Sequence, residues 1–204
     1  MPQRLLALAF FVSGAAALTY QVCWNRYLYA AIGVDLDSTS VIVATFMLGL
    51  GLGNALGAYI ATRGPSLMAF VVIEVLLLAF GALSPHLLIP LGEALMGVSR
   101  GAAASVLFLV LLVPTLLMGA TLPVMTEAAR AKPDLRALNF SALYLYNTLG
   151  GAAGAFLAGF VLLGSFGLKH SIYLAALANL LAAIAAALTI WSARSAAPDA
   201  RTRS

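Results

Sequence analysis

The sequence predicts an all-α, polytopic membrane protein with six transmembrane helices arranged as a 3+3 inverted repeat. The first observation is composition: 63% of the 204 residues are apolar and 9% are charged, against about 45–50% and about 25% in soluble domains. The second is a series of long apolar segments, and the third is a motif near residue 53 that recurs near residue 150. So few charged side chains cannot cover a soluble globule, and so apolar a chain cannot be disordered.

Six apolar segments follow one another, separated by charges, prolines or capping residues. Each exceeds the roughly 20 residues that a membrane-spanning helix needs. We expect spans at residues 5–32, 39–62, 66–91, 102–129, 138–163 and 168–191. They form one membrane domain over residues 1–193, and residues 194–204 are expected to be a disordered cytoplasmic tail. The first segment also resembles a cleavable signal peptide, but its apolar character continues beyond Ala17, which favours a retained helix.

The basic residues predict a multi-pass protein of the cell (inner) membrane with both termini in the cytoplasm. Loops on the cytoplasmic side are enriched in Lys and Arg. In this orientation the inner side holds most of the basic residues, namely Arg4, Arg63, Arg130, Lys132, Arg136, Arg194, Arg201 and Arg203. Arg100 and Lys169 fall outside, and Arg26 lies near the outer end of the first span.

The repeat and its glycines predict close helix packing. Residues 52–61, LGNALGAYIA, match residues 149–158, LGGAAGAFLA. A unit with an odd number of spans must return with opposite topology, as in many secondary transporters. Gly53 and Gly57 share one face of the second span, and Gly150 and Gly154 share one face of the fifth. Small residues at this spacing let two helix backbones approach, so we expect helix-packing faces, which could also slide during a conformational change.

Two acidic residues and two prolines mark the third and fourth spans. Glu74 lies well inside an apolar segment, and a carboxylate at that depth is costly and therefore a candidate for substrate binding or proton relay. The structural alternative is a pair with Arg63 or hydrogen bonds to the second span. Glu127 is interpreted as a helix-end residue that pairs with Arg130.

Pro114 and Pro123 each remove a backbone hydrogen bond, so we expect the fourth helix to be kinked or partly broken there. We interpret such a kink as a gating feature.

Polar and aromatic residues cluster at the end of the first span and recur in the fifth. Tyr20 and Trp24 share one helix face with Tyr27, and such rings are typical either of membrane-interface anchors or of a site for organic cations. The candidate substrate-binding residues are Glu74, Tyr20, Gln21, Trp24, Arg26, Tyr144 and Asn147.

No enzyme, metal, cofactor or nucleic-acid signature is present. GSFG at residues 164–167 lacks the first glycine of a nucleophile elbow, because Leu163 stands there. His86 and His170 fall near helix ends, and no Cys/His/Asp cluster has metal-ligand spacing. With Cys23 as its lone cysteine, the chain cannot form an internal disulfide. We therefore expect neither catalytic residues nor a bound metal or cofactor.

Several motifs are shared with one family of membrane proteins. They are FFVSG at 10–14, LTYQVCWNR at 18–26, ATFMLGLGLG at 44–53, IE at 73–74, PTLLMGATLP at 114–123 and LYLYNTLG at 143–150. In this order they resemble the membrane domain of the spermidine-synthase-like membrane proteins, which is itself similar to half of a major facilitator transporter. In that family a soluble aminopropyltransferase-like domain usually follows, and its glycine-rich motif and catalytic aspartate are absent from these residues. The resemblance implies a membrane module related to polyamine metabolism without synthase activity.

Two functions remain open from the sequence. The first is a half-size transporter for polyamines or another organic cation, which would act as a homodimer because six helices supply half of a twelve-helix cavity. The second is a non-transporting membrane scaffold. It would anchor a separately encoded, soluble aminopropyltransferase-like protein through the loop at residues 130–136 and the basic tail.

Overall fold

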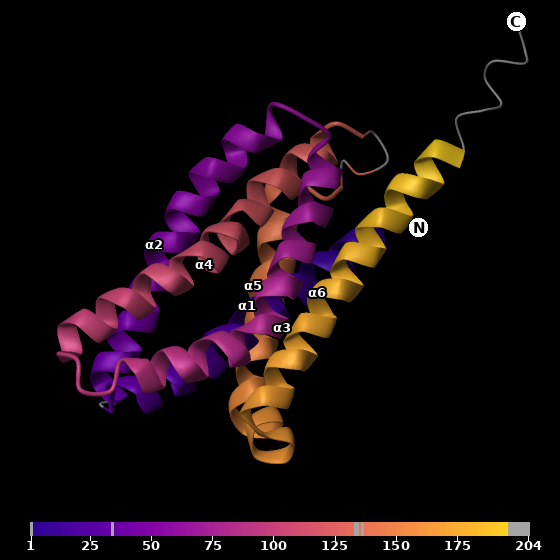
Figure 1. Cartoon of the computed structure of the whole chain (residues 1–204). Helices are drawn as coiled ribbons and strands as arrows, with labels where there is room; N and C mark the ends of the chain where they lie inside the picture. Colours follow the sequence, from indigo (N-terminus) through magenta and orange to yellow (C-terminus); the bar gives the residue numbers. More distant parts are fainter. Residues whose placement is uncertain (1, 34, 133–134, 136, 196–204) are drawn as a thin grey trace, which may run out of the picture.

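The computed structural model describes residues 2–33, 35–132, 135 and 137–195. Figure 1 shows a bundle of long helices, and the described residues form no β-strand. The elements are α1 (Pro2–Ile32), α2 (Asp35–Ala61), α3 (Ser66–Ala94), α4 (Arg100–Arg130), α5 (Phe140–Leu157), the π-helical turn η2 (Ala158–Leu162) and α6 (Leu163–Ser195). The expected tail at 194–204 lies largely outside the described residues, as does Arg136.

Five helices in the described part of the chain are long and apolar enough to cross a membrane, where the sequence analysis expected six. They are Gln3–Ile32, Leu36–Ala61, Ser66–Ala94, Arg100–Arg130 and Phe140–Ser192. The expected spans 138–163 and 168–191 fall within one helical assignment, Phe140–Ser192, because the chain stays helical through η2 and into α6. Two inverted units of three helices need six spans. The five spans of the described residues therefore do not establish the inverted repeat.

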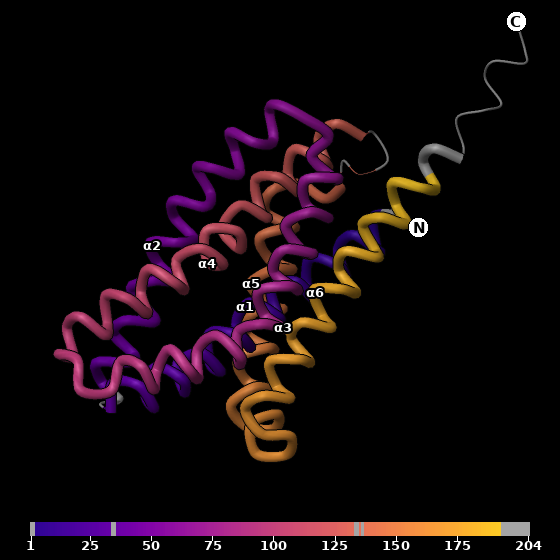
Figure 2. Tube along the Cα trace, viewed as in Figure 1, coloured from indigo at the N-terminus to yellow at the C-terminus, as the bar shows by residue number. Residues whose placement is uncertain are grey.

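The last segment nevertheless departs from helical geometry at one residue. Gly167 has φ 73° and ψ 173° inside α6, a backbone conformation that is essentially restricted to glycine. Figures 1 and 2 show the chain turning back near the start of α6, so that the rest of α6 runs back along the bundle. Both α5 and the rest of α6 pack on α1.

The helices pack in a defined pattern. α2 lies along α4, whereas α1 contacts both α5 and α6, and α3 packs on α6 and α4. Figure 2 shows α2 and α4 as neighbours on one side of the bundle, with α3 and α6 on the other. The largest fully buried side chains are aromatic and lie mainly on α1: Trp24, Tyr20 and Phe10, with Phe46 from α2 and Phe70 from α3.

The glycines of the recurring motif lie at the closest helix crossings. A Cβ atom on Gly53 or Gly57 would meet the backbone of α4 at Leu116 or Ala120. A Cβ atom on Gly150 or Gly154 would instead meet the backbone of α1. Because hydrogen is the only side chain that fits, these helix pairs approach at a distance that larger residues would prevent.

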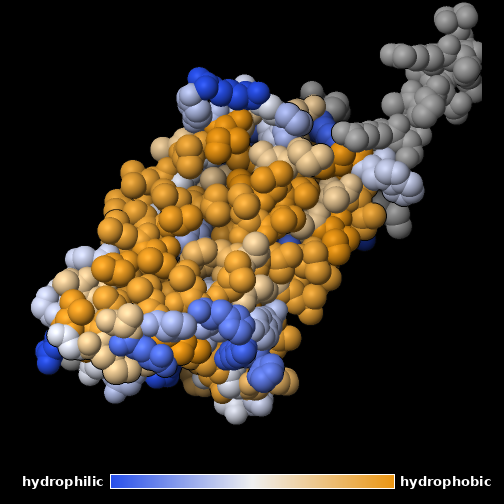
Figure 3. Space-filling model, in the orientation of Figure 1, coloured by the Kyte–Doolittle hydropathy of each residue, from blue (hydrophilic) through white to orange (hydrophobic). Residues whose placement is uncertain are grey.

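The surface has an apolar middle and polar ends. Figure 3 shows a broad hydrophobic band over the helices, with hydrophilic residues gathered at the two ends of the molecule. One end brings together the start of α1, the α2–α3 connection, the end of α4 and the end of α6, since these segments share pockets. Arg4, Arg63, Arg130 and Lys132 belong to this basic end. The band and the helix lengths support a membrane protein.

Candidate functional site

Glu74 is the centre of a buried polar cluster. Its side chain lies on α3 and has no solvent-exposed surface. The neighbouring buried positions on the same helix face are apolar, including Phe70, Ile73 and Leu77. An unpaired carboxylate in such surroundings is strongly unfavourable unless other groups hydrogen-bond to it.

Two side chains from other helices supply those hydrogen bonds. The Ser13 hydroxyl on α1 donates to Glu74 Oε1 at 2.6 Å. The Asn179 amide nitrogen on α6 donates to Glu74 Oε2 at 2.7 Å. Both partners are themselves buried. The carboxylate thus joins three helices, and neither partner is Arg63 or a group of the second span, which the sequence analysis had offered as the structural alternative.

Arg63 makes a different contact. Its guanidinium lies 3.7 Å from the centre of the Tyr59 ring at the basic end. Within the part of the chain that the structure describes, Glu74 has no ion pair, and the ion pair present there joins Arg130 to Glu127 at 3.9 Å. Two hydrogen bonds therefore hold the Glu74 carboxyl group, and no positively charged side chain in the described residues pairs with it.

A layer of aromatic residues lies beside this cluster, between α1 and α3. The Tyr20 and Trp24 rings stack with centroids 4.9 Å apart, and the Trp24 indole N–H donates to the Ser84 hydroxyl at 3.1 Å. Gly81 lies directly against the Tyr20 ring, where a Cβ atom would collide with the phenol. Ser13 contacts Glu74, and further along both helices Trp24 contacts Ser84. The residue numbers increase together, so α1 and α3 run parallel.

Two buried polar atoms near these contacts have no hydrogen-bond partner. They are the Tyr20 hydroxyl and the Asn179 side-chain oxygen. The second belongs to the amide whose nitrogen donates to Glu74. Buried polar groups are rarely left unpaired. The cluster therefore combines a carboxylate with an unused amide oxygen, which is the chemistry of a site for a cationic hydrogen-bond donor.

The other predicted site residues do not join this cluster. Gln21 is half-buried and Arg26 is exposed on α1. Tyr144 is 55% exposed on α5, and its ring stacks on Phe140 at 6.2 Å. Asn147 lies at the crossing of α5 with α1, where its backbone and side-chain oxygens face Gly14.

Helix α4 continues through both of its prolines. It runs unbroken from Arg100 to Arg130 and contains Pro114 and Pro123, so the fourth span is not broken at either proline, and the expected kink stays a prediction. Thr115 lies next to the first proline, and its hydroxyl donates to the carbonyl oxygens of Leu111 and Leu112 at 3.0 and 2.9 Å. Side-chain hydroxyls of this kind help a helix tolerate proline in an apolar environment.

Ser13 and Asn179 were missed as site residues. Asn179 is the sole amide in the long apolar run that follows Tyr173, and a polar residue in such a run is a signal that could have been used. Ser13 carries no such signal, because serine is common in membrane helices. The described residues contain no group of His, Cys, Asp and Glu that could hold a metal ion.

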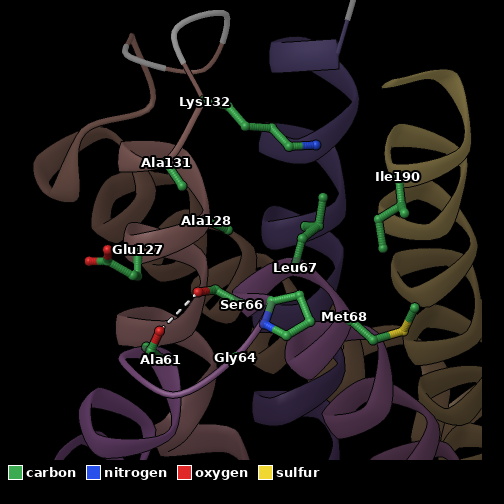
Figure 4. A pocket seen from close by; sticks show the side chains of 11 residues that line it. Ala61, Gly64, Ser66, Leu67, Met68, Glu127, Ala128, Ala131, Lys132 and Ile190 are labelled. Atoms are coloured by element: carbon green, nitrogen blue, oxygen red, sulfur yellow. Dashed lines mark hydrogen bonds between the residues drawn. The ribbon is translucent and has the colours of Figure 1, made fainter. Parts of the chain in front are cut away.

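The surface pockets lie elsewhere. One of about 320 Å³ at the basic end is lined by Ser66 of α3, Glu127 of α4 and Ile190 of α6, and by Lys132, which follows α4. Figure 4 shows the Lys132 side chain extending over Leu67, while the Glu127 carboxylate points away on the other side. Ser66 donates to the Ala61 carbonyl at 3.2 Å there. Glu74 does not line this pocket and has no solvent-exposed surface, so the buried cluster is closed in this conformation.

Comparison of the chain with protein-family models, with curated proteins and with solved structures gives no match. The resemblance to spermidine-synthase-like membrane proteins is neither supported nor refuted by these comparisons and stays a prediction.

Proposed function

We propose that the chain crosses the membrane six times, as two inverted units of three helices in a half major-facilitator-like bundle, with both termini in the cytoplasm. The positive φ of Gly167 supports a sixth crossing, since a glycine turn separates two helical stretches there. The glycine motif of α2 packs on α4, and its counterpart in α5 packs on α1. In such a repeat α1 and α4 are equivalent, so the two packings would be equivalent as well.

The function that we propose for this bundle is transport of an organic cation, such as a polyamine, by a homodimer. The observation that carries the proposal is the fully buried Glu74 carboxylate, which has two hydrogen bonds and no compensating cation in the described residues. Ionisable groups inside a membrane protein are costly and usually serve transport or proton transfer. An ammonium group would supply the missing positive charge.

The surrounding groups fit an ammonium ion. It has several N–H donors and no acceptor, and the unused oxygen of Asn179 and the carboxylate of Glu74 both accept. The stacked rings of Tyr20 and Trp24 offer aromatic faces for a cation–π contact. Because the cluster is closed, α1, α3 and α6 must separate for the cation to enter. The hydrogen bonds from Ser13 and Asn179 would hold the bundle closed until then.

Uptake measurements test this role. Purified protein in sealed liposomes should take up radiolabelled spermidine and putrescine, and Glu74→Gln should reduce uptake to the level of protein-free liposomes. The substitution keeps the side-chain shape. The Asn179 amide can rotate so that its free oxygen accepts from the new amide, so folding should survive. Glu127→Gln is the matched control, because that acid is partly exposed and pairs with Arg130.

Each outcome decides the assignment. Uptake that Glu127→Gln retains and Glu74→Gln loses would support a carrier that depends on the buried carboxylate. Equal uptake by both variants would remove Glu74 from the mechanism. No uptake by the unsubstituted protein, in liposomes that hold their contents, would reject transport of these polyamines.

A second function rests on the basic end. Arg130 is exposed there and Lys132 lines the pocket of Figure 4. A positively charged surface with a pocket beside it favours docking of an acidic soluble protein, as in the scaffold alternative. Its test is co-purification of a soluble aminopropyltransferase-like protein. Arg130→Gln with Lys132→Gln should abolish co-purification, whereas the same change at Arg100, at the opposite end, should not.

A further inference from the structure

A groove between α1 and α6 opens near the basic end of the molecule. It has a volume of about 640 Å³. Leu5 and Leu8 of α1 and Leu188 of α6 line it, and Arg4, Trp191 and Ser192 lie at the end nearer the termini of the two helices. α1 runs away from that end and α6 runs toward it, so the leucines lie deeper along the apolar band than Arg4 and Trp191. The groove therefore changes from apolar to polar along its length.

We propose that this groove binds a phospholipid with an anionic headgroup. One acyl chain would lie against Leu8 and Leu188, which are 58% and 50% exposed. The phosphate would bind the guanidinium of Arg4, whose planar donors match phosphate oxygens. Trp191 lies beside it and is 68% exposed, and tryptophan favours the headgroup region of a bilayer. The ligand class thus follows from one cationic group placed at the mouth of an apolar groove.

The charge of the whole end favours an anionic rather than a zwitterionic lipid. Arg63 and Arg130 are exposed at the same end of the molecule. Basic residues near a membrane surface each contribute about 1 kcal/mol of attraction to anionic lipids. This inference concerns a surface site on α1 and α6, away from Glu74, and it does not depend on transport.

Quenching of Trp191 fluorescence by brominated lipid tests the proposal. The other tryptophan, Trp24, is fully buried, so Trp24→Phe leaves Trp191 as the reporter. The protein is reconstituted in phosphatidylcholine vesicles that contain an increasing fraction of phosphatidylglycerol with brominated acyl chains. Arg4→Gln is compared with Arg100→Gln, an exposed arginine at the opposite end, and brominated phosphatidylcholine serves as the headgroup control.

We expect half-maximal quenching at a phosphatidylglycerol fraction well below that needed for brominated phosphatidylcholine. Arg4→Gln should raise that fraction about fivefold, and Arg100→Gln should leave it unchanged. Quenching that follows the bulk lipid fraction, or that is the same in both arginine variants, would mean ordinary lipid contact and would overturn the proposal. If Trp24→Phe does not fold, native mass spectrometry of the tryptophan-intact chain gives the same comparison. Equal numbers of retained phosphatidylglycerol molecules with and without Arg4 would again overturn it.

Discussion

At the scale of single residues, the hydrogen bond between Asn179 and Glu74 should contribute measurably to stability. Asn179→Ala removes the donor that lies 2.7 Å from Glu74 Oε2 and leaves the carboxylate with Ser13 alone. Hydrogen bonds to charged groups contribute about 1.5–3 kcal/mol, so Asn179→Ala should lower the free energy of unfolding by about that amount. Thermal unfolding of the detergent-solubilised protein measures the difference.

A double-mutant cycle separates this bond from general packing. With Gln in place of Glu74 there is no charge to leave unpaired, so Asn179→Ala should cost at least about 1 kcal/mol less in that background. The free energy of unfolding is compared among the two single variants, the double variant and the unsubstituted chain. Purely additive costs would show that Asn179 stabilises α6 through packing and not through Glu74.

The same residues show what sequence reasoning can find in such a site. A carboxylate inside an apolar segment is visible in the sequence, and Glu74 is indeed buried. Its partners were not visible, because they depend on how α1, α3 and α6 are set against one another along their axes. Tyr20 and Trp24 were placed on one helix face by their spacing. Whether that face meets lipid headgroups or α3 depends on the neighbouring helix, and in the structure both rings are buried.

At the scale of the elements, the crossing of α2 and α4 should depend on Gly53 and not on its neighbour Gly51. A Cβ atom on Gly53 would meet the Leu116 backbone, whereas one on Gly51 would meet nothing within 4 Å. We expect Gly53→Ala to destabilise the protein by about 1–3 kcal/mol, because the two backbones must move apart. Gly51→Ala should be neutral or stabilising by up to about 1 kcal/mol, since alanine is the better helix former. Thermal unfolding of both variants in detergent checks this, and equal destabilisation would contradict it.

The turn inside α6 gives a second matched pair. Gly167 has φ 73° and ψ 173°, whereas Gly164 has no positive φ and open space around it. Alanine at 167 would be strained by about 1–3 kcal/mol, and alanine at 164 should be tolerated. The measurement is the unfolding temperature of Gly167→Ala beside that of Gly164→Ala. A stable Gly167→Ala protein would mean that the chain does not need this turn.

Element boundaries were predictable to different degrees. The expected span 66–91 and the helix Ser66–Ala94 begin at the same residue, because Pro65 precedes a continuous apolar run. The last two spans were not separated as expected. The sequence there has glycines and apolar residues but no proline or charge before Lys169, so helical backbone extends beyond the expected end at residue 163, and the turn comes at Gly167. The two prolines of α4 do not interrupt that helix, although the sequence allowed for a break there.

At the scale of the whole molecule, the number of crossings is the prediction that decides the topology. A straight helix over the 53 residues of Phe140–Ser192 would be about 80 Å long, far beyond the roughly 30 Å hydrocarbon core of a bilayer. Two crossings joined by the turn at Gly167 fit that thickness. We therefore expect the end of α6 to lie on the same side of the membrane as the α2–α3 connection.

Labelling of single cysteines from each side of the membrane tests this. In a Cys23→Ala background, cysteines replace Thr62 after α2, Ser99 before α4 and Ser192 near the end of α6, which are all exposed. A membrane-impermeant maleimide should label positions 62 and 192 in inside-out vesicles and position 99 in right-side-out vesicles. Labelling of 192 together with 99 would mean five crossings, because an odd number puts the two termini on opposite sides. An odd number would also exclude two inverted units of three helices, and with them the equivalence of the α2–α4 and α5–α1 packings. The transport role of Glu74 would then have to stand on the uptake data alone.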